Sequence, residues 1–409
     1  MSQIDELLAR HCPEGVEFRH LVEITSKSAS IKWVSAADAS FKYIDLSSVD
    51  RITRQIGDTV SVTAADAPSR ARQIVRTGDV IFATTRPTQM RWAVIPEEYD
   101  GQIASTGYCV LRPDNDVILT NFLAHILGTG TFSRYVEANQ IEGNYPSIPD
   151  SRVREFKVPV PPLEIQREIV RILDTFSKME AELEAELEAR KQQYDFYRDL
   201  AFENASPRDK WVPLGSLGRF ERGSSLQKKD LKDDGVPCFH YGQVYTHYGV
   251  KTTVTKSFVA GEFAKNKRVL NPGDVFVATT SENEEDLGKA VAWLGEVDAV
   301  ASSDAYIFRS EFDARYVSYF FSSSHFHTQK KRFITGTKVK RISGGSMEKM
   351  DIPNIPLVDQ EQIASMLDKF DALVNDLSVG LPAELAARRQ QYEYYRDKLL
   401  SFKELESSS

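Results

Sequence analysis

An internal duplication constrains the fold of this 409-residue chain more than any other feature. When the sequence is slid by 194 residues, "VPVPPLEIQREIVRILDTF" (158–176) lies on "IPNIPLVDQEQIASMLDKF" (352–370). Two prolines, one glutamine and one aspartate coincide, together with most of the apolar positions. Self-similarity over this length indicates two copies of one structural unit. We therefore expect a chain built from two related halves.

A second pair of matched blocks lies further along each copy. "ARKQQYDFYRD" (189–199) matches "ARRQQYEYYRD" (387–397), but at an offset of 198, so the second copy carries four more residues, close to one helical turn. The segments upstream of the matched blocks are more divergent and share only short similar stretches. "RTGDVIFATT" (76–85) resembles "NPGDVFVATT" (271–280), each a Gly-Asp turn before a strand-like run. The order is a variable domain and a conserved helix, repeated once.

This order predicts the domain organisation. The expected fold class is α+β, with two variable α/β domains separated by two long antiparallel coiled-coil helices that are related by pseudo-twofold symmetry. The expected segments are an N-terminal segment (1–17), a first variable domain (18–157), a central helix (158–207), a second variable domain (208–351) and a C-terminal helix (352–409).

Both conserved helices carry an apolar stripe with alternating spacings of three and four residues, which is typical of a coiled coil. The expected helix-pairing residues are Leu173, Phe176, Leu183, Leu187, Tyr194, Tyr197, Leu367, Phe370, Leu377, Tyr392 and Tyr395. The four tyrosines either pack in this seam or contact a partner protein. Gly380 and Pro382 interrupt the second stripe, and they predict a kink or a break into two helices there.

Charge is distributed unevenly along the chain. The segment 18–157 carries 16 basic and 16 acidic residues, whereas 208–351 carries 22 and 18. The net charges of the two segments sum to +4. The rest of the chain carries −12, which gives the whole chain its net charge of −8. The clearest basic run, "HFHTQKKRFITGTKVKR" (325–341), has six Lys or Arg and no acid. It is either a solvated loop or a loop that follows DNA phosphates.

Other sequence features bear on the compartment. Asp5, Glu6 and Arg10 lie where a signal peptide needs an apolar stretch, and no apolar run approaches the length that spans a bilayer, so we expect a cytoplasmic protein. The three cysteines are widely separated and form no Cys-x-x-Cys pair. We interpret them as small buried or partly buried apolar residues, and expect neither a disulfide nor a metal site.

The two matched blocks, the paired "QQYxxYRD" endings, the "AELE" tetrads (181–188) and "CPEGVEF" (12–18) together resemble the specificity (S) subunits of type I restriction-modification systems. The resemblance covers essentially the whole chain. It implies a non-catalytic subunit in which each variable domain, a target recognition domain, reads one half of a split double-stranded DNA sequence. It also implies that the helices set the gap between the half-sites and dock two methyltransferase subunits.

The resemblance further implies that motor-nuclease subunits join the complex. S-adenosylmethionine, ATP and Mg would then be bound by these partners, and no cofactor by this chain. The residues agree, because the sequence contains neither a Gly-x-Gly-x-x-Gly loop after a strand nor a P-loop. In the resembling family, tetrads such as "AELE" act as spacers. Since each adds roughly 6 Å of helix, we expect one added tetrad to widen the DNA gap by about one base pair.

Candidate DNA contacts combine groups that recognise bases with groups that recognise phosphates, since Arg pairs with guanine and Asn or Gln with adenine. In the first domain they are Arg86, Gln89, Arg91, Asn139, Gln140, Asn144 and Tyr145. In the second they are His240, Tyr241, Gln243, Tyr245, His247, Lys330, Lys331, Arg332, Lys338, Lys340 and Arg341. The alternative for "HYGQVYTHYG" (240–249) is that half of these residues close a β-structure around Gly242 and Gly249.

Two other classes of function remain open from the residues. One is a coiled-coil adaptor without DNA specificity. The other is a self-contained methyltransferase or nuclease. "NYPS" (144–147) faintly resembles an adenine methyltransferase motif but lacks the Pro after Asn, and "PDSRVREFK" (149–157) crowds its acids and lysine just before the helix entry. A DNA shift assay identifies an adaptor, because an adaptor would form no sequence-specific DNA complex. An activity of the isolated chain that depends on S-adenosylmethionine or a metal would identify the enzyme.

Overall fold

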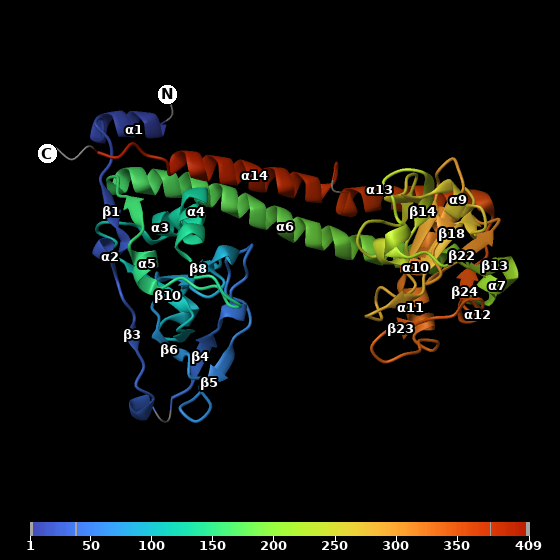
Figure 1. Ribbon diagram of the computed structural model, residues 1–409, viewed down its shortest axis with the longest axis horizontal. Coiled ribbons are helices and arrows are strands. Elements are labelled where there is room, and N and C mark those ends of the chain that lie inside the picture. The colour runs from blue at the N-terminus through green and yellow to red at the C-terminus, as the bar shows by residue number, and fades with distance from the viewer. Residues whose placement is uncertain (1–2, 37–38, 377, 406–409) are drawn as a thin grey trace. The chain divides into compact units, whose positions relative to one another are not determined.

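The computed structural model describes residues 3–36, 39–376 and 378–405 (Figure 1). The chain divides into two compact units: unit 1 comprises 1–184 and 385–409, and unit 2 comprises 185–384. Each unit therefore combines one variable segment with parts of both conserved helices. Within the described ranges, no helix is long and apolar enough to cross a bilayer.

Unit 1 contains two sheets with the orders β2-β10-β7-β8 and β3-β6-β9-β4-β5, and a short ribbon β1-β11. Its strands are β1 (Phe18–His20), β2 (Thr25–Ser26), β3 (Ala29–Ser30), β4 (Phe41–Ile44), β5 (Val60–Val62), β6 (Ala71–Ile74), β7 (Val80–Ala83), β8 (Trp92–Val94), β9 (Ile103–Ser105), β10 (Tyr108–Pro113) and β11 (Lys157–Pro159). Its shorter helices are α1 (Gln3–His11), α2 (Leu21–Ile24), α3 (Thr120–Leu127), α4 (Gly130–Asn139) and α5 (Asp150–Arg154).

Unit 2 repeats this plan with the sheets β13-β22-β18-β20-β15 and β16-β14-β21-β17 and the ribbons β12-β24 and β19-β23. Its strands are β12 (Trp211–Pro213), β13 (Gly218–Arg222), β14 (Val236–Phe239), β15 (Lys251–Thr252), β16 (Ser257–Val259), β17 (Val269–Leu270), β18 (Val275–Ala278), β19 (Thr280–Ser281), β20 (Ala290–Trp293), β21 (Ala299–Ala301), β22 (Ala305–Ser310), β23 (Lys340–Arg341) and β24 (Asp351–Pro353). Its shorter helices are α7 (Leu214–Leu217), α8 (Tyr241–Val244), α9 (Gly261–Ala264), α10 (Ala314–Ser322), α11 (Ser324–Lys330) and α12 (Gly344–Met347).

Three long helices complete the units: α6 (Leu163–Ala205), α13 (Leu357–Asn375) and α14 (Leu381–Leu399). In unit 1 the first half of α6 lies beside α14, and in unit 2 the second half of α6 packs on α13 (Figure 1). Phe176 stacks on Tyr395 with centroids 5.5 Å apart, and Tyr197 stacks on Phe370 at 5.7 Å. The start of each conserved helix thus pairs with the end of the other, as antiparallel symmetry requires.

The remaining seam residues differ in burial. Leu173 and Leu367 are fully buried, Tyr194 is buried, and Leu183, Leu187 and Tyr392 are half-buried. Tyr197 and Tyr395 keep 38% and 36% of their surface exposed, so the stacked pairs lie at the edge of the seam. Leu377 lies outside the described residues.

The predicted interruption of the second helix is confirmed as a break between α13 and α14. Gly380 lies in this break, where a Cβ atom would approach the Ala372 carbonyl oxygen to 2.4 Å. Any larger residue would push the chain away from the end of α13, so glycine is required by close packing rather than by an unusual φ.

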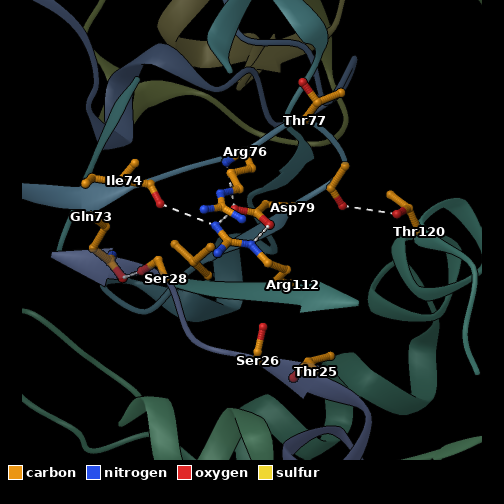
Figure 2. A network of polar contacts seen from close by, with 12 residues as sticks. Thr25, Ser26, Ser28, Gln73, Ile74, Arg76, Thr77, Asp79, Arg112 and Thr120 are labelled. Carbon is orange, nitrogen blue, oxygen red and sulfur yellow. Dashed lines mark hydrogen bonds and ion pairs between the residues drawn. The ribbon is translucent and has the colours of Figure 1, made fainter. Parts of the chain in front are cut away.

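The Gly-Asp turns before β7 and β18 have the same structural role in both units. Asp79, only 1% exposed, accepts the Arg76 backbone N–H at 2.9 Å and forms a bidentate pair with Arg112 at 2.7 and 2.8 Å (Figure 2). Asp274 and Arg309 repeat the pair in unit 2, with Nη2–Oδ2 at 2.9 Å. Because a buried carboxylate needs a cation and N–H donors, this pair fixes where each central strand begins.

Candidate nucleic-acid interface

Two surface loops of unit 1 lie side by side at the end of strand β7. Loop A of unit 1 (84–91) connects β7 to β8, and loop B of unit 1 (140–148) follows α4. Thr85 forms a β-bridge with Ser147, and the Arg86 N–H donates to the Pro146 carbonyl at 2.7 Å. The Arg86 guanidinium lies over the Tyr145 ring, 5.3 Å from its centroid. The two first-domain segments singled out from the sequence are therefore adjacent.

The candidate residues of these loops differ in their availability. Arg86, Gln89, Asn144 and Tyr145 are exposed, and the exposed fraction of Tyr145 reaches 71%. Tyr145, Arg86, Gln89 and Arg91 also line a pocket of about 470 Å³ whose apolar wall includes Leu46 and Ala83. A pocket that combines guanidinium groups, an amide and a ring has the chemistry needed to contact bases and phosphates.

Three other candidates of unit 1 have partners inside the protein or are covered by it. Arg91 donates to the Leu46 carbonyl, and its Nε is buried without a hydrogen-bond partner among the described residues. Asn139 donates to the Tyr135 carbonyl at 2.8 Å and ends α4. The Gln140 Oε1 is likewise buried and unpartnered within the described ranges. These three side chains support the loops from within the protein, and they present few polar groups to solvent.

Unit 2 presents an equivalent loop pair. Loop A of unit 2 (279–289) follows β18, and loop B of unit 2 (331–342) follows α11. Their contact is the ribbon β19-β23, in which Thr280 pairs with Arg341 and Ser281 with Lys340. The Lys340 ammonium also lies 3.1 Å from the Glu284 carboxylate. Lys331, Arg332, Lys338 and Arg341 are exposed.

Lys330 does not fit the predicted phosphate contact. Residues 324–330 form helix α11 instead of a loop, and this helix turns Lys330 inward until only 2% of it is exposed. Its Nζ donates to the carbonyl oxygens of Glu285 at 2.8 Å and Leu287 at 2.6 Å. A buried lysine whose ammonium donates to two backbone carbonyl groups is not available to DNA.

The segment 240–249 is also mostly internal. Its first part forms the short helix α8, in which the His240 ring accepts the Gly242 N–H at 3.2 Å and caps the first turn. His240 is 6% exposed and burial lowers its pKa. Gln243 donates to Ser257 at 2.7 Å and Tyr245 to the Thr280 carbonyl at 2.9 Å, and both, like Tyr241, are half-buried. Of the five candidate DNA contacts in this segment, only His247 is exposed.

Sequence reasoning missed loop A of unit 2. Its exposed side chains include Glu282, Asn283 and Glu284. The loop is acidic, whereas the charged residues expected to contact DNA are basic. The available signal was positional, because "GDVFVATT" precedes this loop as "GDVIFATT" precedes loop A of unit 1.

Each unit also contains a cavity where its variable domain meets the long helices. The cavity of unit 2 has about 560 Å³ and the cavity of unit 1 about 490 Å³. Helix α6 lines the first with Lys191, Tyr194, Asp195 and Arg198. Helix α14 lines the second with Arg389, Tyr392, Glu393 and Arg396, which are the same positions of the repeated "QQYxxYRD" blocks. The duplication therefore includes a cavity as well as the scaffold.

No group of three or more His, Cys, Asp or Glu within the described residues is placed to hold a metal ion. His327 is held neutral, since burial foremost lowers its pKa to about 4. Cys109 and Cys238 are buried free thiols, and burial raises the pKa of each to about 12. Cys12 is half-buried and free.

The sequence matches a known protein family and is similar to proteins of two bacteria. The sequence model of the family described as "Type I restriction modification DNA specificity domain" matches residues 43–190 and 209–387. The EcoR124I/EcoR124II specificity subunit of Escherichia coli is 31% identical over 291 residues, 66% of this chain and 69% of that protein. A putative type I restriction enzyme specificity subunit of Haemophilus influenzae is 25% identical over 324 residues, 76% of this chain and 78% of its own length.

Solved structures share the fold. A chain from a study of complex assembly and conformational transition of the type I R-M system superposes with a TM-score of 0.68 at 23% identity, covering 95% of this chain and 98% of that one. The HsdS subunit of Thermoanaerobacter tengcongensis gives a TM-score of 0.51, also at 23% identity, covering 95% and 97%.

Proposed function

This chain belongs to the type I restriction-modification DNA specificity family, and we propose that it is the non-catalytic subunit that selects the DNA sequence. Each unit would read one half of a bipartite target through loops A and B. The variable domains 18–157 and 208–351 would act as the two target recognition domains. The long helices would set the unspecified gap between the half-sites.

One observation carries this proposal. The same scaffold presents two adjacent surface loops in both units. The loops are joined by equivalent pairings, Thr85 with Ser147 in unit 1 and Thr280 with Arg341 in unit 2. The exposed side chains of the loops nevertheless differ. A shared frame with different readout groups is what two unlike half-sites require, because direct readout depends on the donors and acceptors that reach the base edges.

The partners would bind where the two units are alike. Two identical methyltransferase subunits need two similar surfaces, and the helix-lined cavities repeat a basic residue, a tyrosine, an acid and an arginine at equivalent positions. We therefore assign these faces to the methyltransferase subunits. Motor-nuclease subunits would join that complex. S-adenosylmethionine, ATP and Mg would be bound by these partners, and this chain would contribute no catalytic group.

Selection from randomised duplex DNA tests the function. The chain is mixed with its methyltransferase subunits, bound duplexes are recovered, and the enriched sequences are read. The expected result is two short motifs separated by a gap of fixed length. Complex formation without any enriched sequence would instead identify an adaptor, and methylation or cleavage by the chain alone would identify an enzyme.

A further inference from the structure

Backbone strain in unit 1 is concentrated around loop A. Among the described residues, the non-glycine residues with positive φ are Arg54 (61°), Arg86 (51°) and Met90 (49°). Arg86 and Met90 are the two ends of the short 3-10 turn inside loop A. A left-handed conformation costs an L-residue roughly 1–2 kcal/mol, so it persists only where surrounding contacts enforce it.

The third strained residue, Arg54, supplies such a contact. Its guanidinium donates to the Met90 carbonyl oxygen and lies over the Trp92 ring, 5.1 Å from the centroid. Its own turn is tied down by Asp50, which accepts the N–H groups of Ile52 and Thr53 at 2.7 Å each. Arg54 therefore connects a fixed turn to the end of loop A where the chain enters β8.

The surroundings of Arg54 are those of an internal cation. Desolvation foremost lowers its pKa to about 10, so it still carries its charge at neutral pH. Asp50 and Glu180 favour that charge, while Arg396 opposes it. A charged donor that is shielded from water forms a stronger hydrogen bond than a neutral one.

Unit 2 holds its loop A in the same way but with an unrelated element. The buried Lys330 ammonium, at the end of α11, donates to the carbonyls of Glu285 and Leu287. Tyr245 donates to the carbonyl of Thr280 in the same loop. Arg54, in contrast, comes from a turn between β4 and β5. Two different segments thus place a cation against backbone carbonyls of the equivalent loop.

Contacts to carbonyl oxygens have a specific consequence for a reading loop. Because every residue has a carbonyl, the anchor fixes the path of the backbone and leaves the loop side chains free to differ. Arg86 and Gln89 in unit 1, and Glu282 and Asn283 in unit 2, remain exposed. A loop that is ordered before binding does not pay the ordering entropy when DNA arrives.

We propose that Arg54 and Lys330 are positioning residues that hold loop A of their unit in its reading conformation and so determine half-site specificity without contacting DNA. The proposal rests on the proposed function, since it assigns the order of the loop to sequence discrimination. Each residue acts on one half-site only, which makes the other half-site an internal control.

The test uses the full chain in complex with its methyltransferase subunits and three duplexes: the selected target, and the target with either half-site scrambled. The ratio of dissociation constants, scrambled over intact, measures discrimination at each half-site. The variants are Arg54→Met and Lys330→Met, with the conservative Arg54→Lys as a milder change. Arg72→Met and Lys265→Met, both at exposed positions, are matched controls.

The expected result is that Arg54→Met lowers discrimination at one half-site about tenfold, while Lys330→Met does so at the other. Arg54→Lys keeps the cation and loses less. If the two residues have only a structural role, their replacement reduces the active fraction of protein. Binding of all three duplexes then falls alike, and both ratios stay unchanged. That outcome, or an equal fall of both ratios, overturns the proposal. A wild-type complex that discriminates at neither half-site would reject the proposed function as well.

Discussion

Loops A and B of the two units carry opposite charges on the same scaffold. In unit 1, loop A has two arginines and no acid, and loop B has one acid and no basic residue. In unit 2, loop A has four acids and one lysine, and loop B has five basic residues and no acid. Equivalent positions therefore do not have equivalent roles. The scaffold decides where side chains are presented, and the loops decide whether phosphates or bases can be approached.

The acidic loop of unit 2 limits what that loop can contact. Carboxylates repel phosphates but accept a hydrogen bond from the cytosine amino group. Glu284 is already paired with Lys340 of loop B, which lowers the repulsion next to the basic loop. In unit 2 we thus assign phosphate contacts to loop B and base contacts to the exposed acids of loop A. In unit 1 we expect loop A to make both kinds of contact.

The largest expected effect concerns the shared scaffold. Arg112→Met and Arg309→Met each leave a buried carboxylate, Asp79 or Asp274, without its cation. Each should cost its own unit about 3 kcal/mol of unfolding free energy. Amide hydrogen exchange under native conditions, read separately for the two units, measures this loss. If only one unit were destabilised, the claim of equivalent scaffolds would be wrong.

The next effect concerns the basic loop of unit 2. Replacing Lys331, Arg332 and Lys338 by Gln should weaken binding of every DNA sequence, and the slope of log affinity against log salt should fall by up to about 3. Glu142→Gln in loop B of unit 1 is the counterpart and should not reduce the slope. A loss confined to one DNA sequence, with the slope unchanged, would contradict the assignment of phosphate contacts.

A smaller effect is expected from the exposed pair in loop A of unit 1. Arg86→Ala combined with Gln89→Ala should relax discrimination at one half-site by about 1–3 kcal/mol. The other half-site should keep its discrimination, because unit 2 retains its loops. Competition binding with single-base variants of the target measures both. Equal relaxation at the two half-sites would show that the units do not read independently.

The smallest effect is a pH dependence confined to unit 2. His327 lies among Lys330, Arg198, Lys331 and Asp199, and burial foremost lowers its pKa to about 4. Between its ordinary pKa near 6.5 and about 4, the unfolded chain binds a proton that the folded chain does not, so unit 2 loses stability as pH falls through this window.

Unit 1 supplies the comparison for this pH effect, because Ser133 occupies the equivalent position at the offset of 194. Hydrogen exchange at pH 7 and pH 5 should show the loss in unit 2. His327→Gln should reduce the dependence. A dependence of the same size in that variant would exclude His327 as its source.

The sequence predicts the scaffold well and the roles of single residues poorly. The duplication, the seam with Phe176 and Phe370, and the break at Gly380 follow from periodicity and matched spacing, which depend only on local rules. Lys330 looks identical to Lys331 in the sequence, yet one is buried and the other exposed. That difference arises from the orientation of α11 against loop A, which is a tertiary property.

Arg54 illustrates the same limit. It belongs to no repeated motif, and its importance appears only when its contact with Met90 is seen. Loop A of unit 2 is the opposite case. The repeated strand block before it indicates its position in the sequence, but its acidic residues do not suggest a DNA contact. Matching the two halves strand by strand, and then comparing the loops that follow, would have located it.

Mapping of the methylated bases on DNA reads both half-sites and the gap in one measurement. DNA is modified by the wild-type chain with its methyltransferase subunits, and in parallel by the Arg86→Ala/Gln89→Ala variant. We expect a bipartite motif with a gap of constant length, and a variant motif in which one half is degenerate while the other half and the gap persist. A single contiguous motif, or simultaneous degeneration of both halves, would contradict it.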